Sequence, residues 1–238
     1  MTIDIVAVPV PSDIEGSPIP FDLYREVHKG LRHALFDLTV TVGRADCTAT
    51  AARQDVVTKT LGVIALLHAH HGHEDAFIQP LVEANAPRLA AIIEEGHIET
   101  EQDLVEIEAR LNRLSDAVEG EEVAAGAELY GVLALFTARY LAHMALEEGA
   151  VMSELRGALS LEELFSVEVA IRSTIAPPLM VEFMGAMLPA MNVDERTNML
   201  GGMKASAPAE VFDLFRKAAE SALPADDYAV VATRIGVA

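Results

Sequence analysis

Histidine and glutamate pairs with one fixed spacing recur along this chain and constrain how it can fold. A single histidine, His28, comes first, followed by the pairs His70/Glu74, His97/Glu101 and His143/Glu147. On an α-helix, residues four apart lie on the same face, about one turn from each other. Each pair also continues a stripe of apolar residues at helical spacing. The pattern therefore predicts helices that turn these polar side chains toward a common interior.

The apolar stripes predict four long helices. The first runs from residue 21 to about 43 and the second from 51 to 83, while the third begins at Pro87 and the fourth follows a polar turn around Gly120. Pro80 is expected to kink the second helix or to end its regular part. Four helices with short connections are typical of an up-down-up-down four-helix bundle, so the predicted fold class is all-α.

Three segments are expected along the chain. Residues 1–20 contain four prolines and no helical period, so they are interpreted as an extended lead-in, and residues 21–157 form the predicted bundle. Residues 158–238 are interpreted as a helical extension, which opens on a capping box at Ser160–Glu163. Within it, Pro208 and Pro224 each suggest the first residue of a short helix. A methionine stripe over residues 180–191 is more simply core packing than a soft-metal site.

The composition of the chain excludes several classes of partner and of metal site. The chain of 238 residues has 17 lysines and arginines against 37 aspartates and glutamates, a formal charge of −20 that argues against nucleic-acid and membrane partners. Its one cysteine, Cys47, excludes an intramolecular disulfide and a cysteine-rich metal site. Neither a signal peptide nor a long uninterrupted apolar run is evident, so a cytoplasmic protein is expected.

The polar residues on the inward stripes indicate bound metal. A lone histidine in a helical core is usually structural, but here four histidines and three glutamates share the inward stripes of four helices. Burying carboxylates without cations costs several kcal/mol each, and these stripes carry no lysine or arginine. Seven ligands are too many for one zinc, and His-x-x-x-Glu differs from the Glu-x-x-His of ferritin-like proteins.

The second helix leaves two registers open, His70/Glu74 and His71/Asp75. The first continues the more apolar line, so it is the one we expect to face inward. Residues near the ligands are expected to support them: His73 beside His70, and Tyr24 and Tyr140 one turn from the histidines of their own helices. For the tyrosines, an amphipathic core residue is the simpler interpretation. The other histidines, His33, His68 and His71, are expected at the surface or beside the site.

These ordered motifs resemble the hemerythrin-like, or HHE cation-binding, domain family. The likeness covers about residues 21–155 and rests on five pieces in order: His28, the run His70-His71-Gly72-His73-Glu74-Asp75, the following Pro80, His97, and His143-Met144-Ala145-Leu146-Glu147. The extension is loosely similar to tails of bacterial members. The resemblance implies two iron ions bridged by Glu74, Glu147 and an oxo or hydroxo group. On this mapping His28 and His70 serve one ion, whereas His97 and His143 serve the other.

The chain departs from oxygen-carrying members of the family at two positions. Those proteins have a histidine where this chain has Glu101, and a more widely spaced aspartate where it has Glu147. Both differences argue against reversible oxygen carriage, because an added carboxylate stabilises the ferric state.

Two functions follow from the resemblance. The first is a di-iron module that senses or handles iron, oxygen, nitric oxide or redox state. The second is a di-iron enzyme that acts on peroxide or nitric oxide with an external reductant. Zinc or manganese is expected as a substitute in purified protein, and the extension suggests a homodimer contact.

Overall fold

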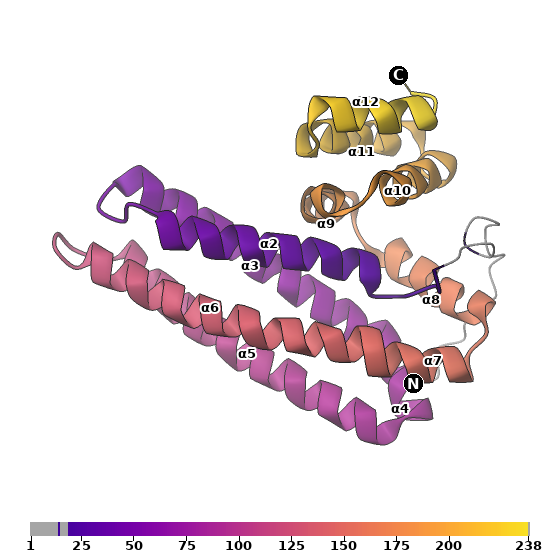
Figure 1. Ribbon diagram of the computed structural model, residues 1–238, viewed down its shortest axis with the longest axis horizontal. Helices are drawn as coiled ribbons and strands as arrows, with labels where there is room; N and C mark the ends of the chain where they lie inside the picture. The colour runs from indigo at the N-terminus through magenta and orange to yellow at the C-terminus, as the bar shows by residue number, and fades with distance from the viewer. Residues whose placement is uncertain (1–13, 15–18, 238) are drawn as a thin grey trace. The chain divides into compact units, whose positions relative to one another are not determined.

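The protein is all-helical throughout its described part. The structure, a computed structural model, describes residue 14 and residues 19–237. Every regular element in this part is a helix, and it contains no strand (Figure 1). The predicted all-α class is therefore confirmed. The extended lead-in expected for residues 1–20 lies almost wholly outside the described residues.

The chain divides into two compact units, each described here by itself. The first contains Leu35–Arg172 with the described residues before Arg25, and the second contains Arg25–Ala34 and Ser173–Ala238. The helix α2 (Arg25–Arg44) therefore contributes to both units. The limits expected from the sequence, residues 21–157 and 158–238, divide the chain differently.

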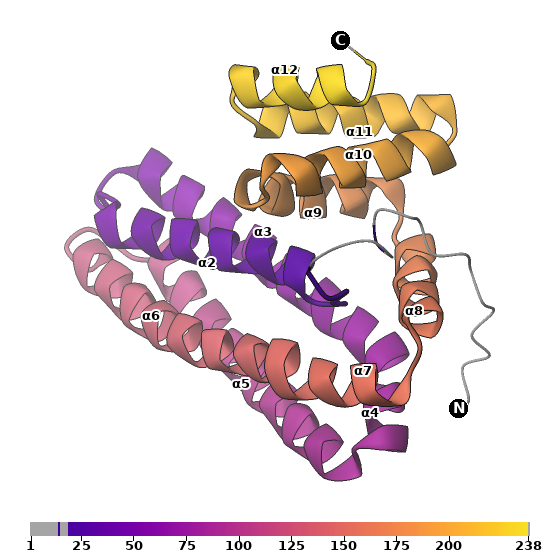
Figure 2. The same ribbon diagram turned by 45° about the vertical axis from the view of Figure 1, so that its right-hand side comes forward.

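Three long helices lie side by side in the first unit and form its framework (Figures 1 and 2). They are α3 (Thr50–His73), α5 (Pro87–Ser115) and α6 (Glu122–Leu146). As predicted, α5 begins at Pro87, because the fixed φ and missing N–H of proline suit the first helical position. Buried apolar side chains from each helix, such as Leu67, Leu104 and Phe136, fill the space between them.

Two π-helical turns interrupt this framework, and each begins at a glutamate of a His-x-x-x-Glu pair. The turn η1 (Glu74–Ile78) separates α3 from α4 (Gln79–Asn85), and the turn η2 (Glu147–Val151) separates α6 from α7 (Met152–Ala158). The single helix expected for residues 51–83 is therefore divided, just before the proline that was expected to disturb it. Turns of this kind are rare and often mark functional sites.

One stretch of the described chain, Glu122–Ala158, is apolar and long enough to cross a membrane by those two measures alone. A core helix of a soluble protein has the same properties, and this stretch includes buried residues such as Phe136, Tyr140 and Glu147. The stretch is consistent with a soluble protein.

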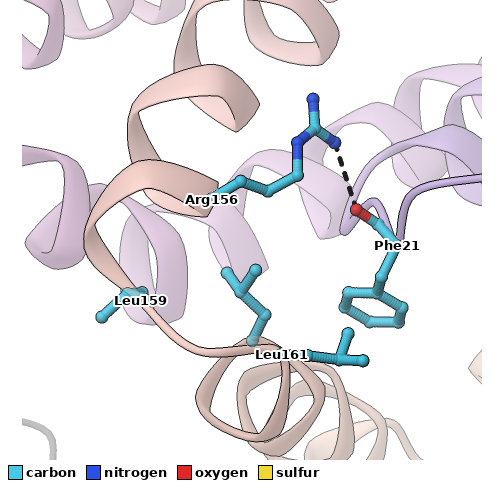
Figure 3. A pocket seen from close by; sticks show the side chains of 5 residues that line it. Phe21, Arg156, Leu159 and Leu161 are labelled. Atoms are coloured by element: carbon cyan, nitrogen blue, oxygen red, sulfur yellow. Dashed lines mark hydrogen bonds between the residues drawn. The ribbon is translucent and has the colours of Figure 1, made fainter. Parts of the chain in front are cut away.

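A shallow groove opens at the end of the first unit, between its first residues and the junction of α7 with α8 (Leu161–Thr174). Its lining is mostly apolar and consists of Phe21, Arg156, Leu159, Leu161 and Leu164. In Figure 3 the Arg156 guanidinium donates a hydrogen bond of 3.1 Å to the Phe21 carbonyl. Nearby, Ser160 and Glu163 form the predicted capping box at the start of α8. None of the predicted metal ligands lines this groove.

Short helices make up most of the second unit: α9 (Pro177–Ala190), α10 (Val193–Ser206), α11 (Ala209–Ala222) and α12 (Ala225–Arg234). Pro208 and Pro224 immediately precede α11 and α12, within one residue of the positions expected for them. Met184, Met187 and Met191 are buried, as expected for core packing. Met187 packs against Gly30, where an added Cβ would lie 2.7 Å from the methionine Cγ.

Candidate metal centre

The two π turns and the helices beside them gather histidines and glutamates inside the first unit. His70, His71, Glu74, His97 and Glu147 are buried, and the exposed fractions of Glu74 and Glu147 are only 3% and 1%. His143 is close to fully buried as well. The inward direction expected for the pairs on α3 and α6 is thus what the structure shows.

His97 lies between the two glutamates. Its Nε2 atom is 3.5 Å from Glu74 Oε2 and 3.6 Å from Glu147 Oε1. These distances are long for hydrogen bonds. Two ligand atoms bound to one ion at about 2.1 Å lie about 3.0–3.5 Å apart. The spacing around His97 is therefore close to that of ligands that share a cation.

Each glutamate also faces the histidine one turn before it. His70 Nε2 is 3.0 Å from Glu74 Oε1, and His143 Nε2 is 3.1 Å from Glu147 Oε1. Each carboxylate therefore lies between two imidazoles, one from its own helix and one from α5. Gly96 leaves room for this arrangement, because an added Cβ would lie 2.6 Å from His143 Nδ1.

His71 belongs to the buried cluster, contrary to the surface or flanking position expected for it. Its ring stacks on His97 with the centroids 4.8 Å apart, and its Nε2 is 3.1 Å from the Tyr140 hydroxyl. His71, His97 and His143 each offer a nitrogen within 4.8 Å of the others. Successive helical residues are only 100° apart, so His70 and His71 can flank the inward line together. Ile64, which lies two turns earlier on the same face as His71 and is buried, is the feature of the sequence that could have indicated an inward position for His71.

Glu101 does not take the inward position expected for it. Its side chain is 51% exposed, and its carboxylate lies 3.3 Å from His68 Nε2 and 3.7 Å from His71 Nδ1. The buried residue at this level of α5 is Thr100, three residues after His97. Spacings of three and four both fit a helical face, and here the inward line takes the spacing of three. None of the residue groups in the described chain that could hold a metal contains Glu101.

The remaining predicted residues lie as follows. His28 is fully buried on the part of α2 that belongs to the second unit. Tyr24 and Tyr140 are buried, while His73 is partly exposed. Burial, and then the charges of Glu74 and Glu147, raise the pKa of both tyrosines well above the usual value. Both phenols therefore stay protonated at neutral pH.

Asp75 contacts the cluster from outside, a role that the sequence analysis missed. Its carboxylate is exposed, and Oδ1 lies 2.9 Å from His97 Nδ1. A carboxylate at Nδ1 fixes the orientation of the ring and turns Nε2 toward Glu74 and Glu147. The sequence signal was the position directly after Glu74, which puts Asp75 on the side of the π turn nearest α5.

The two stacked histidines have opposite electrostatic environments. Burial tends to lower the pKa of His97, but the negative charges of the nearby Glu147 and Glu74 carboxylates outweigh it and raise the pKa to about 10. Burial, followed by the charge of His70, lowers the pKa of His71 to about 3. Without metal at neutral pH, His97 is an imidazolium between carboxylates, whereas His71 is a neutral imidazole.

This contrast predicts how the stability of the metal-free protein depends on pH. The folded-state pKa of His97 lies above the ordinary value of 6.5, so protonated His97 stabilises the fold fully below about pH 6.5. That stabilisation is lost as the pH rises through 10. We expect the melting temperature of chelator-treated protein, followed by circular dichroism, to fall between pH 7 and pH 10. The melting temperature of the His97→Asn variant should fall clearly less over the same pH range. An equal fall in the variant would contradict the raised pKa of His97.

Three buried imidazole nitrogens in the described cluster make no hydrogen bond: His71 Nδ1, His97 Nε2 and His143 Nε2. Buried polar atoms are nearly always satisfied, and a cation would satisfy several of these at once. The cluster can therefore hold a metal ion.

Comparison with family models, curated proteins and solved structures finds no match for this chain.

Proposed function

We propose that the buried cluster is a non-heme di-iron centre within a hemerythrin-like four-helix bundle. The observation that carries this proposal is the position of His97 Nε2, within 3.6 Å of carboxylates from two different helices. Two carboxylates that each face two imidazoles are suited to bridging two ions. The all-helical first unit, with α3, α5 and α6 side by side, is compatible with such a bundle.

The proposed ligand set changes the expected one at a single position. Glu74 and Glu147 would hold the ions together with His70 on α3 and with His97 and His143, and His28 stays a ligand predicted from the sequence alone. His71 takes the place that the sequence analysis gave to Glu101, because His71 is buried beside His97 and His143. A neutral imidazole then replaces a carboxylate, and the argument from Glu101 for a stabilised ferric state no longer applies.

The environment of the cluster supports binding or sensing of small ligands. Bound iron would supply redox chemistry and binding of small molecules such as oxygen, nitric oxide or peroxide. Because Glu74, His97 and Glu147 are buried, a ligand that reaches them must be small. The protonated hydroxyl of Tyr140 hydrogen-bonds with His71 and holds that ring against His97.

Anaerobic purification with metal analysis and an absorption spectrum tests this proposal. We expect about two iron ions per chain after iron loading, and new near-ultraviolet absorption on exposure to oxygen or peroxide. A single tightly bound zinc ion, with no spectral change after iron loading, would contradict a di-iron centre. Repeated consumption of peroxide or nitric oxide with a chemical reductant would favour the enzyme over the sensor.

A further inference from the structure

Glu101 forms a connection between solvent and the buried cluster. It is half exposed, and its two oxygens face different histidines: Oε2 is 3.3 Å from the half-exposed His68, and Oε1 is 3.7 Å from the buried His71. These three residues come from two adjacent helices, α3 and α5. His71 is in turn grouped with His97 and His143 within 4.8 Å. These three contacts therefore lead from the surface to the centre of the cluster.

We infer that His68 and Glu101 are the place where a divalent cation enters the cluster, with His71 as its first buried ligand. This inference rests on the proposed function, since it assigns a route to the proposed metal centre. At 3.7 Å, Glu101 and His71 are too far apart for a good hydrogen bond, but a cation between them could contact both. His71 Nδ1, which points to this gap, makes no hydrogen bond.

The charge around Glu101 favours this route. The chain has a formal charge of −20, and α5 carries further exposed acids at Glu94, Glu95 and Glu99. Clustered charge of one sign raises the local concentration of the opposite ion and its rate of capture. The exposed acids would collect cations over the surface of α5, and the Glu101 carboxylate lies 3.7 Å from His71 Nδ1, a buried nitrogen that makes no hydrogen bond.

A second exposed group, Asp75 with Glu94, also lies near His97 and could hold a cation. There, however, the near nitrogen is His97 Nδ1, which already lies 2.9 Å from Asp75. A cation would have to break that hydrogen bond, and it would still be on the opposite side of the ring from Glu74 and Glu147. Entry past Glu101 requires no hydrogen bond to be broken, so it is the route that we propose.

The rate of Co²⁺ uptake by the metal-free full chain tests the route. Co²⁺ gives visible absorption when bound by histidine and carboxylate, so stopped-flow absorbance reports uptake without any enzymatic assay. We expect Glu101→Gln to slow uptake about fivefold, and the double variant with His68→Gln to slow it further. Both should reach the same final stoichiometry and spectrum as the wild type. The difference should shrink at high salt, because exposed charges are screened.

Matched variants separate the route from general effects of charge. Glu99→Gln removes the same charge two residues away and should slow uptake much less. Asp75→Asn tests the second route, and a larger effect there than at Glu101 would overturn the inference. So would a rate for Glu101→Gln equal to that of Glu99→Gln, or a lower final stoichiometry, which would make Glu101 a ligand. If the wild type binds no Co²⁺ or iron, the proposed function fails as well.

Discussion

Glu74→Ala should abolish binding of both metal ions and remove the stabilisation that metal gives to the fold. Glu74 is buried, and its two oxygens face different histidines, His70 at 3.0 Å and His97 at 3.5 Å. In the proposed centre Glu74 would contact both ions, so its loss should affect both, whereas loss of a histidine that serves one ion should affect mainly that ion. Metal analysis after iron loading should give less than about 0.2 ions per chain.

The same variant should lose the thermal response to metal. A ligand present at a thousand times its dissociation constant stabilises the native state by about 4 kcal/mol, which is about 10 °C in a protein of this size. We expect metal to raise the melting temperature of the wild type by about that amount and that of Glu74→Ala by almost nothing. Glu83→Ala, an exposed glutamate of α4, is the control and should behave like the wild type. Full metal content in Glu74→Ala would rule out a bridging role.

The spacing of the polar pairs was enough to predict the helical class and much of the cluster. A histidine and a glutamate four residues apart can share one helical face, and on α3 and α6 they do. The apolar residues before each pair indicated which face is buried, because Leu67 lies on the same helical face as His70, and Phe136 on the same face as His143. Local periodicity carries this information, so the sequence alone could supply it.

The sequence period does not determine how far each helix is rotated about its own axis. A buried face is wide enough to include positions three and four residues on, and only packing against neighbouring helices selects between them. On α5 this selection buries Thr100 and leaves Glu101 exposed, while on α3 it buries both His70 and His71. The π turns that begin at Glu74 and Glu147 have no residue signature of their own. The contact of Asp75 with His97 depends on the first of them.

His71→Ala should lower the metal content from about two ions per chain to about one. The variant removes the imidazole that lies with His97 and His143, whereas His70 and Glu74 remain for the other ion. It also removes the ring stacked on His97 and the partner of the Tyr140 hydroxyl, so a loss of stability without metal is expected too. Tyr140→Phe removes only the hydroxyl and should keep about two ions. The exposed His33 provides a second control, and His33→Ala should match the wild type in every measurement.

Rescue by a small molecule separates a ligand from a packing residue at this position. In His71→Gly, added imidazole can occupy the space of the missing ring and present a nitrogen to the cluster. If His71 is a ligand, imidazole should restore the second ion and the spectrum of the wild type, whereas a non-coordinating ring of similar size, such as cyclopentane, should not. If both molecules restore stability and neither changes the metal content, His71 serves only to hold His97 in place. His71 would then have to be removed from the proposed ligand set, and Glu101 would again be the candidate ligand at that position.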